Sequence, residues 1–135
     1  MQLSQFLINN PVNDLTKEVY VSSRFKDENG NKIPFKIKAI SGEEYASYRK
    51  QALRVSKNGV EFDTKKFNEL IIINHTLDPN FRDAEAIKAT GCMTPEQFMY
   101  RSLLAGEIDA LAAKITDLSG FNTTVEEARE TVKNS

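Results

Sequence analysis

The sequence has little of the chemistry on which most enzymes, secreted proteins and membrane proteins depend. Its 135 residues include one cysteine, one histidine and no tryptophan. The single cysteine, Cys92, excludes an internal disulfide and fits a reducing compartment. No apolar run approaches the length of a membrane-spanning helix, and residues 1–10 lack the basic flank and apolar stretch of a signal peptide. We therefore expect a cytoplasmic protein.

The charge balance also excludes a strong bias toward one class of partner. Lysine and arginine total 18 and aspartate and glutamate total 19, which gives a net charge of −1. Such a chain has no general attraction for nucleic acid or an anionic membrane. With 40% hydrophobic and 27% charged residues, the composition is that of an ordinary globular protein. At this length one domain can bury roughly two thirds of its unfolded surface.

Neither the histidine nor the cysteine has the neighbours that catalysis requires. His75 lies between Asn74 and Thr76, so no nucleophile or carboxylate is adjacent in sequence. We favour a histidine at a helix end that bonds to nearby carbonyl groups over a general base. Cys92 follows Gly91 with nothing that marks an activated thiolate, which favours a buried or loop thiol over a nucleophile.

Metal and phosphate motifs are absent from the sequence as well. The acidic and amide residues at 27–31 suggest a calcium loop, but an EF-hand requires glycine at its sixth position and glutamate at its twelfth. Those positions hold Lys32 and Lys38. The chain has no glycine-rich phosphate loop, no paired cysteine and histidine ligands, and no Gly-x-Ser-x-Gly elbow. We predict no enzymatic activity, no metal and no cofactor.

The N-terminal part predicts a short helix followed by an antiparallel hairpin. Residues 3–9 place apolar side chains at helical spacing, and Asn10-Pro11 ends that helix. Turn residues at 27–31 then separate two alternating runs, whose apolar faces would hold Val19, Val21 and Phe25 and, after the turn, Ile33, Phe35, Ile37 and Ala39. Pro34 cannot donate to a strand ladder, so its strand should lie at an edge or leave that side unpaired.

Four cations would line the outer face of this hairpin. They are Arg24, Lys26, Lys36 and Lys38. A patch for nucleic acid or an acidic partner is one interpretation. We favour a face that lysines keep soluble and unpaired, because Tyr20 is the only aromatic residue there.

The middle of the chain predicts two longer helices. Ser41 and Glu44 form a capping box that opens a helix running to about Val55. Residues 57–60 form a turn, with a small hairpin to residue 62 as an alternative. Asp63 or Thr64 then caps a helix whose apolar residues are Phe67, Leu70, Ile71, Ile73 and Leu77. The run at 71–73 is β-branched, but the helical spacing of these residues favours a buried helix.

Residues 78–121 predict a series of short helices with clear start and stop signals. After the Asp78-Pro79 turn, Asp83 caps a helix that ends at Gly91. Thr94, Pro95 and Gln97 supply the N-cap, first position and capping-box amide of the next helix. A third helix follows and closes at Gly120-Phe121, with the phenylalanine folding back on its last turn. The stripe along these last helices comprises Leu103, Leu104, Ile108, Leu111, Ile115 and Leu118.

The predicted fold class is α+β: an N-terminal antiparallel β-hairpin or small sheet followed by a cluster of four to five short helices. We expect one domain over residues 1–121. Thr124 and Glu127 form a third capping box, so residues 122–135 would be a polar helix or tail that frays.

These features together resemble the XkdN-like tail assembly chaperones of phages and prophages that infect Gram-positive bacteria. The segment at 22–41 carries part of the resemblance, as a strand, turn and second strand. The rest is carried by Asp78-Pro79-Asn80-Phe81, Asp83, Glu85, Gly91, Leu103-Leu104, Gly106-Glu107, Leu111, Ile115 and Leu118-Ser119-Gly120-Phe121. The similarity spans most of the chain and weakens at 57–67 and after Phe121.

The resemblance implies a non-enzymatic chaperone in the cytoplasm of the bacterial host that does not remain in the finished virion. Family members are thought to coat the tape measure protein, a very long, largely helical chain, and keep it soluble. A longer form made by ribosomal frameshifting recruits the tail tube protein. Self-association is also implied, whereas membrane and nucleic-acid partners are not. The alternative function is a structural tail-completion or connector protein that stays in the particle.

The end of the chain permits a frameshift site. Val132-Lys133-Asn134 can be encoded by the slippery heptamer A-AAA-AAC or A-AAA-AAT. Residues 64–66 permit a similar heptamer, but the position of Lys133 near the terminus favours that site. A Val132 codon that does not end in A would exclude it.

Candidate partner-binding residues come from two apolar groups. An adaptable surface for many weak contacts suits methionine and aromatic side chains. The helical stripe could either pack into the core or form a groove for an amphipathic helix. The candidates are Met93, Phe98, Met99, Tyr100, Leu103, Leu104 and Ile108.

Overall fold

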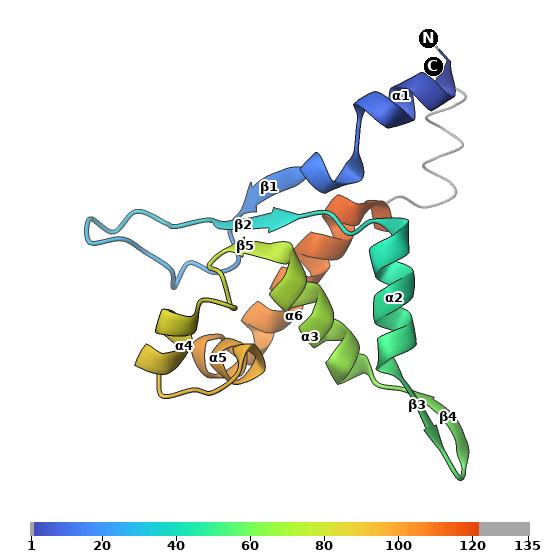
Figure 1. Ribbon diagram of the computed structural model, residues 1–135. Helices are drawn as coiled ribbons and strands as arrows, with labels where there is room; N and C mark the ends of the chain where they lie inside the picture. The colour runs from blue at the N-terminus through green and yellow to red at the C-terminus, as the bar shows by residue number, and fades with distance from the viewer. Residues whose placement is uncertain (1, 122–135) are drawn as a thin grey trace.

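The first two strands of a small antiparallel sheet precede most of the helices in the computed structural model, which describes residues 2–121 (Figure 1). Five α-helices follow the N-terminal hairpin, so the predicted α+β class is confirmed. The third capping box, the polar segment at 122–135 and the slippage site at Lys133 lie outside the described residues. No helix within residues 2–121 is both long and apolar enough to cross a membrane.

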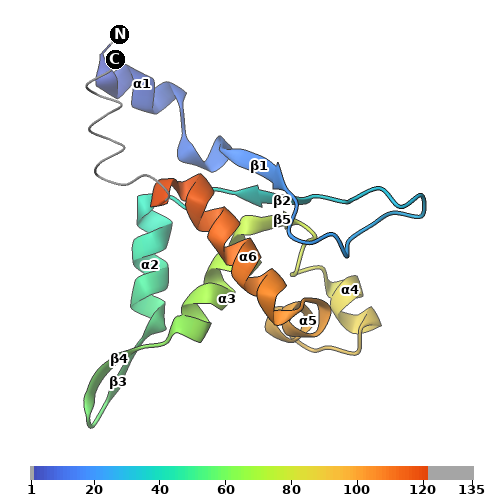
Figure 2. The same cartoon turned by 180° about the vertical axis from the view of Figure 1, so that it is seen from behind.

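The N-terminal helix α1 (Leu3–Asn9) stands apart from the rest of the molecule. It ends where predicted, and the Asn10 side chain donates a hydrogen bond of 2.9 Å to the carbonyl of Phe6. A short 3₁₀ turn (Val12–Asp14) leads from it to the sheet. None of the α1 side chains is buried, and Figures 1 and 2 both show the helix projecting beyond the sheet.

The main sheet contains strands β1 (Thr16–Val19), β2 (Phe35–Lys38) and β5 (Thr76–Asp78) in the order β1-β2-β5. Both pairings are antiparallel, and Val19 faces Phe35. The predicted hairpin is therefore confirmed, but β2 is the central strand, so an edge position for it is wrong. Pro34 is accommodated because it lies just before the first paired residue of β2.

The first strand is shorter than its alternating pattern suggests. Val21 and Phe25 lie beyond the end of β1, although both still pack against the core. The chain pairs again at Lys26 and Lys32, where an isolated bridge flanks the predicted turn. In that turn the Asp27 carboxylate accepts hydrogen bonds of 2.9 Å from two backbone amides. Residues 20–34 are thus a long connection rather than a tight hairpin loop.

Helix α2 (Gly42–Ala52) begins with the predicted capping box between Ser41 and Glu44. It ends before Val55 because the chain turns directly into strand β3 (Leu53–Ser56). This strand pairs with β4 (Gly59–Phe62), which confirms the small hairpin. The hairpin projects from the body of the molecule at the end opposite α1 (Figure 1).

Helix α3 (Thr64–His75) is the central helix of the fold. Asp63 caps it, and the β-branched run at 71–73 is helical and buried, as predicted. It contacts α2, α5 and α6. The helix does not include Leu77, contrary to the prediction, because residues from Thr76 pair with β2 and form β5 instead.

Three shorter helices complete the chain: α4 (Ala84–Ala89), α5 (Pro95–Ser102) and α6 (Ala105–Thr116). Asp83 and Thr94 cap α4 and α5 as predicted. A π-helical turn (Asp117–Phe121) extends α6, and Gly120 within it has a left-handed φ of +96°. The Phe121 ring lies 4.9 Å from that of Tyr45 on α2.

The core lies between the sheet and helices α3, α5 and α6 (Figure 2). It is built mostly from aliphatic side chains, with the aromatic rings of Phe35, Tyr48 and Phe81 buried among them. The fully buried hydrophobic members are Ile37, Ile71, Ile72, Phe81, Met99, Leu111 and Ile115.

Candidate partner-binding groove

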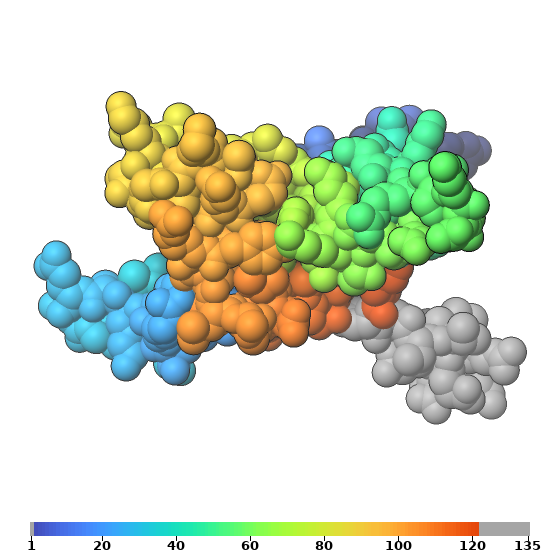
Figure 3. Space-filling view, turned by 90° about the horizontal axis from the view of Figure 1, so that it is seen from below, coloured from blue at the N-terminus to red at the C-terminus, as the bar shows by residue number. Residues whose placement is uncertain are grey.

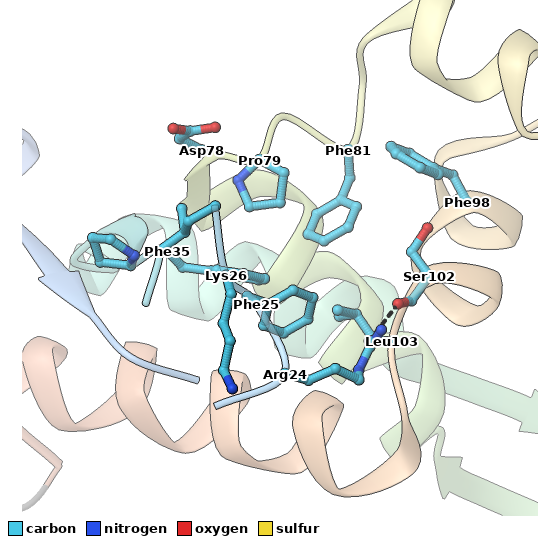
Figure 4. Close-up of a pocket in the computed structure, with 12 residues that line it drawn as sticks. Arg24, Phe25, Lys26, Phe35, Asp78, Pro79, Phe81, Phe98, Ser102 and Leu103 are labelled. Atoms are coloured by element: carbon cyan, nitrogen blue, oxygen red, sulfur yellow. Dashed lines mark hydrogen bonds between the residues drawn. The ribbon is translucent and has the colours of Figure 1, made fainter. Parts of the chain in front are cut away.

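A groove of about 370 Å³ opens beside the core, between the β1–β2 connection, the turn after β5 and helix α5 (Figure 4). The connection and helix α5 each contribute both apolar and polar side chains, and Asp78 at the end of β5 precedes the apolar residues Pro79 and Phe81 of the turn. Figure 3 shows the light-blue connection lying against the orange α5–α6 region at one side of the molecule. The polar lining residues are Arg24, Lys26, Asp78 and Ser102, and most of the others are apolar.

Aromatic rings make up much of the apolar lining. Phe25 packs on Phe35 with ring centroids 5.0 Å apart, and Phe81 meets Phe98 edge-on at 5.7 Å. Phe81 is only 1% exposed, so it belongs to both the core and the groove. Leu103 closes the end of the lining at the α5–α6 junction. The groove therefore offers an apolar surface that is continuous with the core.

One ion pair fixes the position of the β1–β2 connection. The Arg24 guanidinium donates to both carboxylate oxygens of Glu107, at 2.9 Å from Nε and 2.7 Å from Nη2. The same Nη2 donates to the carbonyl of Ser102 at 2.9 Å. Glu107 also accepts from the backbone amide of Leu104 at 2.8 Å, which completes the start of α6. The pair thus ties the connection to the α5–α6 junction with bidentate geometry.

The environment of Glu107 favours its charged form. The hydrogen bonds from Arg24 lower the pKa of this carboxyl to about 2, although burial acts in the opposite direction. Glu107 is 5% exposed, whereas the Arg24 side chain stays partly in solvent. The prediction that Arg24 lies on an outer cationic face is therefore wrong. The connection turns it toward α6, where a buried carboxylate needs a partner.

We expect the Arg24–Glu107 pair to behave as a coupled unit in a double-mutant cycle. Arg24→Gln and Glu107→Gln should each lower the midpoint of urea unfolding, because each leaves a hydrogen-bonding partner unsatisfied. The double variant should lose clearly less than the sum of the two single losses. Circular dichroism during urea titration measures all three midpoints.

The matched control is a second, looser ion pair. Arg54 and Asp63 approach to 3.7 Å, and the Arg54 side chain is 66% exposed. Arg54→Gln should therefore change the unfolding midpoint little. Additive losses at Arg24 and Glu107, or a loss at Arg54 of equal size, would contradict the expected coupling.

The single histidine lies in a buried network away from the groove. His75 is 0% exposed, and its Nε2 lies 2.8 Å from the Tyr48 hydroxyl and 3.8 Å from a Glu44 oxygen. Burial lowers the pKa of His75, and the Glu44 carboxylate opposes that shift. The partner of Nε2 is thus the hydroxyl of Tyr48 on α2. The residues next to His75 in the sequence give no indication of this contact.

Cys92 is buried in the loop between α4 and α5, as predicted for a structural thiol. Its sulfur lies 3.9 Å from the carbonyl of Thr90. Among residues 2–121, no three histidine, cysteine, aspartate or glutamate side chains gather closely enough to hold a metal ion.

The predicted partner-binding residues divide between core and surface. Met99 and Leu103 are buried at 0% and 7% exposure, because α5 turns them toward α3 and the sheet. Phe98 and Ile108 are half-buried, and Phe98 lines the groove. The exposed members are Met93, Tyr100 and Leu104. Of these candidates, Phe98 and Leu103 line the groove, whereas Tyr100 and Ile108 lie together in a separate, shallower hollow between α3 and α6.

Most of the groove was not visible in the sequence. The sequence pattern places Phe25, Ile33 and Phe35 on a buried hairpin face, and Phe81 in a turn. The segment at 22–41 and the Asp78–Phe81 turn both carry the family resemblance. That shared feature is the signal in the sequence that could have pointed to the groove. Nothing in their spacing indicates that the two segments meet.

The same architecture occurs in known proteins. The model of the family described as "Phage XkdN-like tail assembly chaperone protein, TAC" matches residues 3–133. The chain belongs to the XkdN-like phage tail assembly chaperones. Its expected resemblance to this family is thereby confirmed.

Two Bacillus subtilis (strain 168) proteins are similar over most of this XkdN-like chaperone. The protein YqbN is 30% identical over 138 residues, covering 98% of this chain and 93% of YqbN. The phage-like element PBSX protein XkdN is 30% identical over 123 residues, covering 87% and 83%. The crystal structure of YqbN superposes with a TM-score of 0.70 at 27% identity, over 90% of this chain and 98% of that one.

Proposed function

We propose that this tail assembly chaperone binds the tape measure protein, keeps it soluble in the cytoplasm of the bacterial host, and helps to recruit the tail tube protein. A longer frameshifted form would carry out the recruitment. The finished virion would not retain the chain, and no catalytic step is involved. Family membership supports a role in tail assembly. The proposal adds the identity of the client, the tape measure protein.

The observation that carries the proposal is the amount of apolar surface that the fold leaves uncovered. On α1, Leu3 and Ile8 are each 72% exposed. On the β3–β4 hairpin, Val55 and Val60 are cross-strand partners with exposures of 83% and 64%. Together with the groove, these are several separate apolar contact surfaces on one small domain. Such surfaces are typical of proteins that bind other proteins.

Many modest apolar contacts suit a long helical client. A tape measure chain would present repeated apolar stripes, and each would need cover until assembly. Contacts of this kind bind without fine specificity, so many copies of the chaperone can lie along one client. Met93, Tyr100 and Leu104 add exposed apolar area and remain candidates for such contacts.

Co-expression with the tape measure protein of the same gene cluster tests the proposal. We expect a soluble complex, and size-exclusion chromatography with light scattering should give several copies of this chain per client. A client that stays insoluble while this chain elutes alone would contradict the proposal. Mass spectrometry of purified virions provides the second test. Detection of this chain in stoichiometric amounts would favour a structural tail-completion or connector protein instead.

A further inference from the structure

The groove carries opposite charges at its two edges. Lys26 extends from the β1–β2 connection, and Asp78 ends β5; Figure 4 shows them on opposite sides of the apolar lining. Both side chains are exposed, and neither forms an ion pair with another residue in the described range 2–121. Arg24, by contrast, is already paired with Glu107. Lys26 and Asp78 are therefore the charges available to a partner.

The groove is formed before any partner arrives. Its outer wall is the connection at residues 20–34, which the Arg24–Glu107 pair holds against the α5–α6 junction. Gly30 and the Asp27 turn bend the connection back toward β2. A wall held by bidentate hydrogen bonds loses little conformational freedom on binding. This favours a docking site over an incidental gap in packing.

The occupant should be helical rather than extended. The central strand β2 pairs with β1 on one side and β5 on the other, so it has no free edge to which a strand could add. Strand β5 is at an edge of the sheet, but Asp78 is the one residue of its three that lines the groove. What the groove presents is side chains, as in helix-in-groove recognition. Helix α1 of a second copy is apolar enough to fit, but residues 3–9 contain no charged side chain. It would leave Lys26 and Asp78 without partners.

We propose that this groove binds an amphipathic helix of the client, with apolar side chains in the groove, an acidic flank facing Lys26 and a basic flank facing Asp78. The two edge charges set the direction in which the helix lies. This inference rests on the proposed function, because it names the chemistry of the client segment that the chaperone holds.

Charge exchange at the groove edges tests the proposal. The probe is a designed peptide of about 18 residues, labelled for fluorescence anisotropy, with a leucine stripe, glutamates on one flank and lysines on the other. At low salt we expect Lys26→Glu and Asp78→Lys each to weaken binding about fivefold. The double variant should recover wild-type affinity, because the peptide then binds in the reverse direction. Unchanged single variants, or a double variant weaker than either, would overturn the proposal.

An apolar substitution with a matched control locates the binding surface. Ile33 lines the groove and is 44% exposed, so Ile33→Asp should be tolerated by the fold while it weakens peptide binding more than about tenfold. Val12→Asp places the same charge on an exposed apolar position of the 3₁₀ turn before β1, outside the groove lining, and should leave binding unchanged. Equal losses in both variants would mean general apolar adsorption and would overturn the groove assignment. Circular dichroism checks that each variant is folded.

Light scattering of the protein alone separates a second copy from a client helix. If Ile33→Asp dissolves a wild-type oligomer but leaves peptide binding intact, the groove belongs to self-association and the proposal fails. The solubility of the full tape measure protein is a separate measurement from peptide binding. A tape measure protein kept soluble by wild type and equally by the charge variants would retain the proposed function but remove the groove from it. If peptide binding depends on the edge charges but the tape measure protein stays insoluble, the groove assignment would stand and the proposed function would fail.

Discussion

Replacing Phe81 with alanine is expected to lower the free energy of unfolding by about 3–5 kcal/mol. The ring is 1% exposed and meets Phe98 edge-on at 5.7 Å. It belongs to the core cluster and to the groove lining, so its removal would leave a cavity between β5 and α5. A loss of this size is a large fraction of the total stability of a typical domain, about 5–15 kcal/mol. Urea unfolding followed by circular dichroism measures it.

Two further variants test whether burial is the cause. Phe81→Leu keeps an apolar side chain of intermediate volume and should lose less stability than the alanine variant. Phe121 is also a phenylalanine packed near another ring, but it is 57% exposed. Phe121→Ala should therefore cost clearly less than Phe81→Ala. Equal losses at the two positions would show that the turn after β5 does not anchor the core.

The stability of the protein is expected to fall as the pH drops below about 6.5, and His75 should be the main cause. Burial lowers the pKa of this histidine in the folded state, while the unfolded chain keeps the ordinary value. The unfolded state therefore binds more protons in this range, and unfolding is favoured as the pH decreases toward the folded-state pKa. The slope for one proton is at most about 1.4 kcal/mol per pH unit.

The groups around His75 decide how strong this dependence is. Glu44 opposes the shift and Lys38 adds to it, while the Tyr48 hydroxyl bonds to Nε2 at 2.8 Å. Hydrogen bonds from Ser41 lower the pKa of Glu44 despite its burial, and the pKa of Glu107 is also lowered. Both carboxyl groups therefore lose their stabilising charge only below their ordinary range, at lower pH than His75.

The measurement is urea unfolding at several pH values between about 7 and 5. His75→Gln, which cannot gain a charge, should flatten the dependence in this interval while it lowers stability at neutral pH. Tyr48→Phe is the companion variant, since it removes the hydrogen bond but leaves the titrating ring in place. An unchanged slope in His75→Gln would assign the acid sensitivity to another group.

The elements that local chemistry specifies were predictable from the sequence. Ser41, Asp63, Asp83 and Thr94 each cap the helix that their positions indicated. These bonds join residues two or three positions apart, so short-range sequence contains all the information. The helical spacing around residues 71–73 likewise outweighed the strand preference of β-branched side chains, because a buried helix can accommodate them.

Strand β5 shows where that reasoning stops. Leu77 continues the apolar pattern of α3, but Thr76 and Asp78 pair with β2 instead. A three-residue strand exists only because a central strand offers it hydrogen bonds. The partner lies far away in sequence, and no local pattern indicates it. For the same reason β2 could be mistaken for an edge strand.

The sequence alone determined the N-caps of helices α2 to α5, the turn chemistry, the α+β class and, through the order of its motifs, the family. Only the tertiary structure decided that Arg24 meets Glu107 and that Phe25, Phe81 and Phe98 line one groove with Lys26 and Asp78 at its edges. It also decided that Met99 faces the core rather than a partner. The physical reason is range: caps and turns depend on neighbours along the chain, whereas burial and ion pairing depend on which distant segments pack together.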